Sequence, residues 1–161
     1  NFYKHKSDKS NKIKGTQEIE GNLMDLFKDG KLDLICHGAN CQGIMGAGIA
    51  RQIKTRYPLA LNEDHLFPLN ALQKLGNLSY VKVISYGYIV NLYSQLIPGP
   101  NFDKTAFRLA LKKLPFYFEE GSSIGLPRIG CGIGGGTWNE VKSIIIEELH
   151  DYFHVTIVNY K

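Results

Sequence analysis

The sequence has few cysteines and no long hydrophobic run. Its three cysteines, Cys36, Cys41 and Cys131, are an odd number and form no CxxC or Cys/His pattern, which argues against a disulfide framework and a zinc site. No apolar run approaches the roughly 20 residues that span a bilayer, and the polar N-terminal segment does not resemble a secretory signal. We therefore expect no metal, no cofactor, no membrane partner and a cytoplasmic location with free thiols.

The chain also has little net charge, and its excess of positive residues lies at the N-terminus. The net charge is only +4, and the first fourteen residues carry more lysines than that: Lys4, Lys6, Lys9, Lys12 and Lys14. Aromatic residues are not interleaved with these lysines, as they would be in a nucleic-acid-binding arm. We interpret residues 1–15 as a flexible leader and expect no nucleic-acid partner.

The remaining residues, 16–161, have the length of one domain. An apolar fraction of 43% in a chain of 161 residues is typical of a globular protein that buries its own core, and we expect a monomer. Strand-like and helix-like patterns alternate along the chain. The expected strands are 16–20, 32–37, 80–85, 88–92, 123–127 and 154–160, and the expected helices are 48–57, 70–74, 104–120 and 137–150.

Several residues indicate where these helices begin and end. Pro58 should stop the helix that begins at Gly48, and Pro115 should kink or restart the helix over 104–120. Thr137 followed by Glu140 predicts a capping box on the last helix. This alternation predicts an α/β fold with a mostly parallel sheet, whose ligands bind beyond the carboxyl ends of the strands.

Two glycine-rich segments each join a strand to a helix. They are Gly43-Ile44-Met45-Gly46-Ala47-Gly48 and Gly130-Cys131-Gly132-Ile133-Gly134-Gly135-Gly136. Such a backbone can approach a phosphate closely and can offer it main-chain amides and a helix N-terminus. Either segment alone could be a simple turn, but five glycines within seven residues cost roughly 0.5 to 1 kcal/mol each in backbone entropy. That cost favours a pair of anion-binding loops.

Two common nucleotide-binding motifs fit poorly. Gly130, Gly132 and Gly135 satisfy a G-x-G-x-x-G pattern, but one strand alone follows, and it ends in Val158-Asn159-Tyr160 without the acidic residue of a dinucleotide-binding fold. Neither loop leads into Lys followed by Ser or Thr, as a P-loop would.

The order of four motifs resembles the macrodomain family over nearly the whole chain from Thr16 onwards. The motifs are Gly21-Asn22-Leu23; Cys36-His37-Gly38-Ala39-Asn40-Cys41-Gln42-Gly43; Gly46-Ala47-Gly48-Ile49-Ala50; and Leu126-Pro127-Arg128-Ile129-Gly130-Cys131-Gly132-Ile133-Gly134-Gly135. The resemblance implies a three-layer α/β/α sandwich that binds ADP-ribose. The ligand-binding residues it implies are Asn22, Leu23, Asn40, Gly46, Ala47, Gly48, Ile49, Gly130, Cys131, Gly132, Ile133, Gly134, Gly135 and Asn159.

The chain departs from the family pattern at informative positions. Asn22 stands where relatives usually carry an aspartate that accepts from the adenine amino group, and Gly134 replaces an aromatic ring, which widens the distal pocket. The branch that cleaves ADP-ribose from macromolecules uses a lysine after the fourth strand and an aspartate in the second loop. This chain has Tyr93-Ser94-Gln95-Leu96 and Gly134 there. His37 and Cys41 instead match the ADP-ribose-1''-phosphate phosphatase branch.

The chemistry of that branch points to His37 and Asn40 as the catalytic candidates. An imidazole facing the cleft could activate water or protonate the leaving oxygen, whereas one facing the core would be structural. Asn40 would anchor the distal ribose, since an amide both donates and accepts. Cys41 and Cys131 lack the arginine of a Cys-x5-Arg loop and are interpreted as packing residues.

Three functions therefore compete. The first is a phosphatase that acts on ADP-ribose-1''-phosphate, the second is a glycohydrolase that releases ADP-ribose from modified macromolecules, and the third is an ADP-ribose-binding module without turnover. The sequence favours the phosphatase, with ADP-ribose or its 1''-phosphate as the partner.

Overall fold

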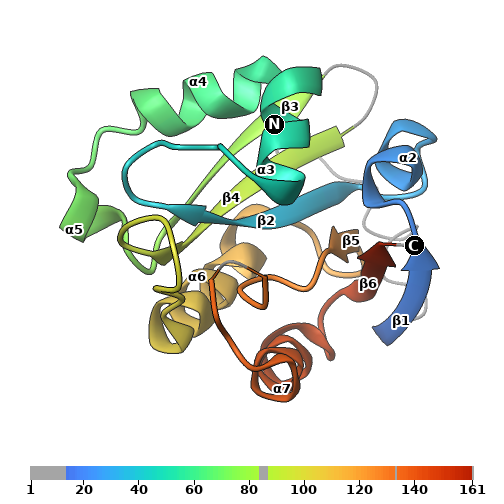
Figure 1. The fold of residues 1–161 in the computed structure, drawn as a ribbon. Helices are drawn as coiled ribbons and strands as arrows, with labels where there is room; N and C mark the ends of the chain where they lie inside the picture. Colours follow the sequence, from blue (N-terminus) through green and yellow to red (C-terminus); the bar gives the residue numbers. More distant parts are fainter. Residues whose placement is uncertain (1–13, 84–86, 133, 161) are drawn as a thin grey trace.

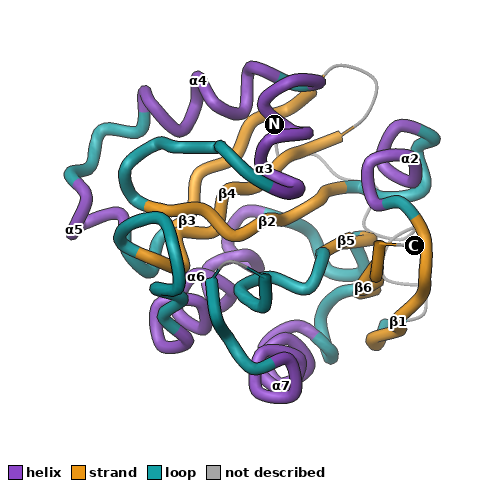
Figure 2. The backbone as a smooth tube through the Cα atoms, in the orientation of Figure 1, coloured by secondary structure: helices purple, strands orange, loops and turns teal. Residues whose placement is uncertain are grey.

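The computed structural model describes residues 14–83, 87–132 and 134–160. Within these residues, six strands form one sheet in the order β1-β6-β5-β2-β4-β3 (Figures 1 and 2). Neighbouring strands are parallel except for the antiparallel pair β3 and β4, which confirms the expected mixed, mostly parallel sheet. The strands are β1 (Gly15–Gly21), β2 (Leu34–Asn40), β3 (Leu78–Val83), β4 (Gly87–Gln95), β5 (Ser123–Leu126) and β6 (His154–Tyr160).

Helices cover both faces of the sheet and complete a three-layer α/β/α sandwich (Figure 1). They are α2 (Leu23–Lys28), α3 (Gly48–Arg56), α4 (Pro58–Leu66), α5 (Ala71–Lys74), α6 (Lys104–Tyr117) and α7 (Trp138–Leu149). The apolar faces of α6 and α7 share one core with the sheet, and α2, α3 and α4 share the other. In β2 the side chain of Cys36 joins the first core and that of Ile35 the second, because successive residues of a strand face opposite sides.

The sequence did not predict the helices α2 and α4, and the capping box expected at Thr137 is absent. Pro58 does end α3, but it also occupies the first turn of α4, where its missing amide costs nothing. Thr137 precedes α7 without a side-chain capping bond, and Glu140 binds Lys104 at 2.9 Å instead. The helix α6 runs through Pro115 to Tyr117 without the restart that was one of the two expected outcomes; the single main-chain hydrogen bond that Pro115 removes lies close to the end of the helix.

The strands β2 and β4 run further toward the ligand side than their apolar residues indicated. They end at Asn40 and Gln95 rather than at His37 and Leu92. The polar residues His37 and Asn91, which also lie inside the expected strands, are fully buried. The expected strand over 80–85 is β3, whose last two expected residues lie outside the described part of the chain, as do residues 1–13 of the expected leader. No helix among the described residues is long and apolar enough to cross a membrane.

Candidate ligand-binding cleft

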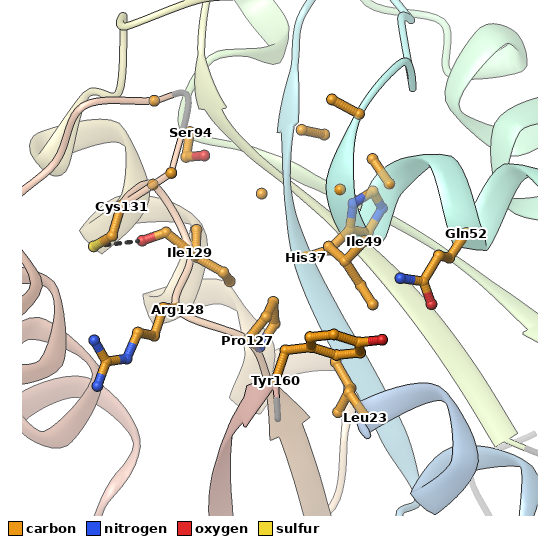
Figure 3. A pocket seen from close by; sticks show the side chains of 18 of the residues that line it. Leu23, His37, Ile49, Gln52, Ser94, Pro127, Arg128, Ile129, Cys131 and Tyr160 are labelled. Carbon is orange, nitrogen blue, oxygen red and sulfur yellow. Dashed lines mark hydrogen bonds between the residues drawn. The ribbon is translucent and has the colours of Figure 1, made fainter. Parts of the chain in front are cut away.

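A cleft of about 930 Å³ lies beyond the carboxyl ends of the parallel strands, the position expected for this kind of sheet. Its size suits a ligand as large as a dinucleotide fragment. One wall is the loop before α3, the opposite wall is the loop between β5 and α7, and the ends of β1 and β6 close one end (Figure 3).

Most of the site residues expected from the sequence line this one cleft. They are Asn22, Leu23, His37, Asn40, Gly46, Ala47, Gly48, Ile49, Gly130, Cys131, Gly132, Gly134 and Asn159. Gly135 lies outside the lining and packs against Pro100, 3.3 Å from where its Cβ would stand. Ile133 lies outside the described residues.

The first glycine-rich loop delivers the N-terminus of α3 to the cleft. Ala47 is the N-cap and Gly48 begins the helix with a φ of +57°. Because alanine has no polar side chain, it cannot satisfy the first amides of the helix, and Gly48, Ile49 and Ala50 all line the cleft. The positive end of the helix dipole therefore faces the ligand space.

The side chain of Asn40 organises this loop. Its Oδ1 accepts from the amides of Gln42 and Ile44 at 3.0 and 3.3 Å, and its Nδ2 donates to the Ile44 carbonyl at 2.7 Å. One hydrogen of the Asn40 amide group is left for a ligand, since Nδ2 carries two.

His65, on α4, forms a hydrogen bond with the main chain of the same loop. The His65 ring nitrogen Nε2 lies 2.9 Å from the Gly43 carbonyl oxygen. A Cβ on Gly43 would stand 2.7 Å from His65 Cδ2, and the φ of Gly43 is +72°. The loop can therefore take this path only with glycine at position 43.

The second glycine-rich loop folds on itself. The amide of Gly136 donates to the Gly130 carbonyl at 2.5 Å, and that of Gly135 to the Gly132 carbonyl at 3.2 Å. At Gly132 an added Cβ would meet no atom within 4 Å. Gly132 is exposed and lines the cleft, so its main chain is accessible at the edge of the ligand space.

The other end of the cleft is formed by Asn22, Leu23 and Tyr160 (Figure 3). Asn22 caps α2, because its Oδ1 accepts from the Asp25 amide at 3.1 Å. The hydrogens on Asn22 Nδ2 remain available to donate to a ligand. Tyr160 is 79% exposed, and its ring offers a flat apolar surface next to Leu23.

Asn159 is fixed by charged neighbours. Its Oδ1 accepts from Arg128 Nε at 2.9 Å and its Nδ2 donates to Glu18 Oε2 at 2.8 Å. The Arg128 guanidinium also lies over the Trp138 ring and points away from the cleft in Figure 3. Hydrogen bonds from Lys142 and Asn159 lower the pKa of Glu18 to about 2.

His37 is fully buried, and its ring extends from β2 toward α3 at the inner wall of the cleft (Figure 3). Its Nε2 lies 2.6 Å from Asn91 Oδ1, while its Nδ1 has no hydrogen-bond partner among the described residues. Burial lowers the pKa of His37 below its ordinary 6.5, so the ring is neutral at physiological pH.

The thiols near the cleft are protonated. Burial raises the pKa of Cys41 to about 11 and also raises that of Cys131, whose Sγ donates to the Ile129 carbonyl at 3.5 Å. Neither thiol is therefore a ready nucleophile at neutral pH. Among the described residues, no group of three His, Cys, Asp or Glu side chains is arranged to hold a metal ion.

The sequence interpretation missed Gln52 and Glu20, which also line the cleft. Gln52 lies one turn after Gly48 on the same face of α3, a spacing that could have indicated it. Pro98 and Gly99 line the cleft beside Gln95. The Gln95 Nε2 donates to the carbonyls of Ile97 and Gly99 at 2.8 and 3.0 Å.

The fold and the cleft together define a macrodomain fold. The chain superimposes on the macrodomain of Thermus aquaticus DarG with a TM-score of 0.68 and 23% identity, over 91% of this chain and 97% of that one. It also superimposes on a Trypanosoma brucei macrodomain solved in complex with ADP-ribose, with a TM-score of 0.60 and 18% identity over 91% of this chain and 63% of that one. A comparison with models of known protein families finds no match.

One curated sequence is similar over most of its length. It is the uncharacterized 17.5 kDa protein in the tk-vs intergenic region of Enterobacteria phage T4, which is 37% identical over 134 residues, or 79% of this chain and 85% of the phage protein. The chain belongs to the same family as this phage protein.

Proposed function

We propose that the cleft binds ADP-ribose and that the protein hydrolyses the terminal phosphate of ADP-ribose-1''-phosphate. The observation that carries the proposal is the opposition of two glycine-rich loops across one cleft, each leading into a helix. Two such loops suit a diphosphate, because main-chain amides and a helix N-terminus bind anions without a basic side chain.

The two ends of the cleft suit the two ends of ADP-ribose. Leu23 and Tyr160 supply apolar surface for the adenine ring, with the Asn22 amide at its edge. At the other end, the remaining hydrogen of Asn40 Nδ2 is available to a ribose hydroxyl. Gly134 also lines the cleft, but the position of its Cβ is filled by the Gly130 main chain at 2.9 Å and by Gln95 Oε1 at 3.2 Å, so this glycine does not widen the distal pocket as the sequence suggested.

His37 is the candidate base. In the proposed step, a water oxygen bonds to the terminal phosphorus and its proton passes to His37 Nδ1, while the bond from phosphorus to the C1'' oxygen breaks. The leaving oxygen takes a proton from solvent and becomes the hydroxyl of ADP-ribose. Amides of the second loop would offset the charge that develops on the phosphoryl oxygens.

The complete burial of His37 favours a second candidate, an ADP-ribose-binding module without turnover, because water must reach Nδ1 for the base to act. A glycohydrolase fits less well. At the places where the resemblance expects the lysine and the aspartate of that activity, this chain has Tyr93-Ser94-Gln95-Leu96 and Gly134.

Phosphorus NMR with ADP-ribose-1''-phosphate tests the proposal. The parent protein should release inorganic phosphate, and His37→Ala should release none while still binding ADP-ribose in calorimetry. A shifted but uncleaved substrate signal with the parent protein would establish the binding module instead. Asn40→Ala should weaken ADP-ribose binding in every case, and an unchanged affinity would refute the cleft assignment.

A further inference from the structure

A chain of buried polar side chains begins at an ion pair beneath α4. Lys74 Nζ donates to Asp64 Oδ1 at 3.2 Å, and the Tyr93 hydroxyl donates to the same oxygen at 2.7 Å. The Tyr93 oxygen also lies 2.8 Å from Ser79 Oγ. All four residues are buried. Because Tyr93 gives its one hydrogen to the carboxylate, its oxygen must accept from Ser79.

Asn91 continues the chain to His37. Its Nδ2 donates to Ser79 Oγ at 3.1 Å and to the main-chain carbonyl of Ala60 at 3.3 Å. A main-chain carbonyl can only accept, so the contact with the Ala60 oxygen fixes the orientation of the Asn91 amide group, with Nδ2 toward Ala60 and Ser79. The amide oxygen is thereby turned to His37 Nε2, 2.6 Å away.

This direction of donors decides which nitrogen of His37 carries hydrogen. An amide oxygen accepts and never donates, so Nε2 must be the N–H. A neutral imidazole has a single N–H, which leaves a lone pair on Nδ1. That atom is buried with no hydrogen-bond partner among the described residues, although buried polar atoms are almost always paired.

We infer that Asn91 is a positioning residue that holds His37 as the Nε2–H tautomer and reserves the Nδ1 lone pair for the cleft. The inference deepens the proposed phosphatase function and rests on it for the role of Nδ1 as base. It adds a residue that lies outside the cleft lining and acts through His37 alone. The wrong tautomer would present an N–H to the incoming water and could not take its proton.

The ring nitrogens of His37 can be observed directly by long-range ¹H–¹⁵N NMR of the full chain, with the His37→Gln variant to assign its signals. Nε2 should be protonated and Nδ1 unprotonated, and ADP-ribose should shift the Nδ1 signal. The opposite tautomer, or an Nδ1 signal that ADP-ribose leaves unchanged, would overturn the inference. Neither readout depends on turnover, so a chain with no phosphatase activity would refute the proposed function separately.

Asn91→Leu, similar in size, tests the effect on catalysis. Its kcat should fall about 100-fold, the scale of a lost general base, while the affinity for ADP-ribose stays within about twofold. The matched control is Thr156→Val, which removes another buried hydrogen-bonding side chain, on β6, and should leave kcat unchanged. An equal fall in both variants, or an unchanged His37 tautomer in Asn91→Leu, would contradict the positioning role. If Asn91→Leu does not fold, the tautomer of the parent protein decides the question.

Discussion

Gly130 lies against the ring of Phe102 so closely that a Cβ at position 130 would stand 2.3 Å from the ring carbon Cδ1. Its φ of +78° is also a conformation that few residues other than glycine adopt. Gly132, two residues later in the same loop, has open space where its Cβ would be. Packing and main-chain conformation thus require glycine at position 130, whereas neither requires it at position 132.

Alanine should therefore have opposite effects at the two positions. Gly132→Ala should leave the thermal unfolding temperature unchanged or slightly raised, but it should weaken ADP-ribose binding by about tenfold, or ~1.4 kcal/mol, because its methyl group occupies the space of a phosphate. Gly130→Ala should lower the free energy of unfolding by about 1–3 kcal/mol through backbone strain. Calorimetry and thermal melts measure both effects. Full affinity in Gly132→Ala would show that no phosphate approaches this loop.

Asn22→Asp should increase the affinity for ADP-ribose. Aspartate caps a helix as well as asparagine does, so the stability of α2 should not change. The second carboxylate oxygen of aspartate would accept from the adenine amino group, where Asn22 presents the N–H donor Nδ2. A hydrogen bond to a charged group is worth about 1.5–3 kcal/mol, and we expect roughly tenfold tighter binding by calorimetry. The control ligand is the hypoxanthine analogue of ADP-ribose, which has no amino group. An equal gain with that ligand would contradict adenine recognition by residue 22.

Glu18 should contribute stability that depends on pH. Its pKa falls from 4.5 to about 2 in the folded protein, so the contribution is fully present above pH 4.5 and is lost as the pH falls toward 2. Thermal melts of the parent protein and of Glu18→Gln should therefore differ most above pH 4.5 and converge in acid. A constant difference down to pH 2 would show that the carboxylate charge is not responsible.

The ion pair between Asp64 and Lys74 should matter more than those on the surface. The two side chains are 1% and 8% exposed, so Lys74→Met leaves a buried carboxylate unpaired and should cost about 3 kcal/mol in urea unfolding. Lys112→Met is the matched control, because Lys112 is 54% exposed in its pair with Glu148. It should change stability by less than about 1 kcal/mol. Similar losses in both variants would refute the difference in burial as the cause.

The sequence predicted the sheet well wherever apolar residues dominate. Residues 154–160 are rich in β-branched residues, and the expected strand coincides with β6; the two glycine loops were located by composition alone. The helix α4 was missed because Pro58 ends one helix and begins the next. A proline is typical both of the residue after a helix and of the first turn of a helix, and the sequence around Pro58 does not show that both occur there.

The polar interior could not be predicted in the same way. His37, Asp64 and Asn91 are far apart in the sequence. His37 and Asn91 each follow an apolar run, and Asp64 lies among other polar residues, so nothing local indicates that the three belong together. Their hydrogen bonds exist only after β2, β4 and α4 have packed together. The sequence identified His37 as a candidate base, but not the residues that hold its ring.

The lining of the cleft runs from Glu20, at the end of β1, to Tyr160, at the end of β6. The two strands pair side by side although they stand at opposite ends of the described chain. A ligand in this cleft can therefore bind only the fully assembled domain, and binding and global folding become thermodynamically linked. At a concentration 100 times its Kd, such a ligand would raise the free energy of unfolding by about 2.7 kcal/mol. A chain truncated before β6 should therefore show no binding of the ligand, rather than weakened binding.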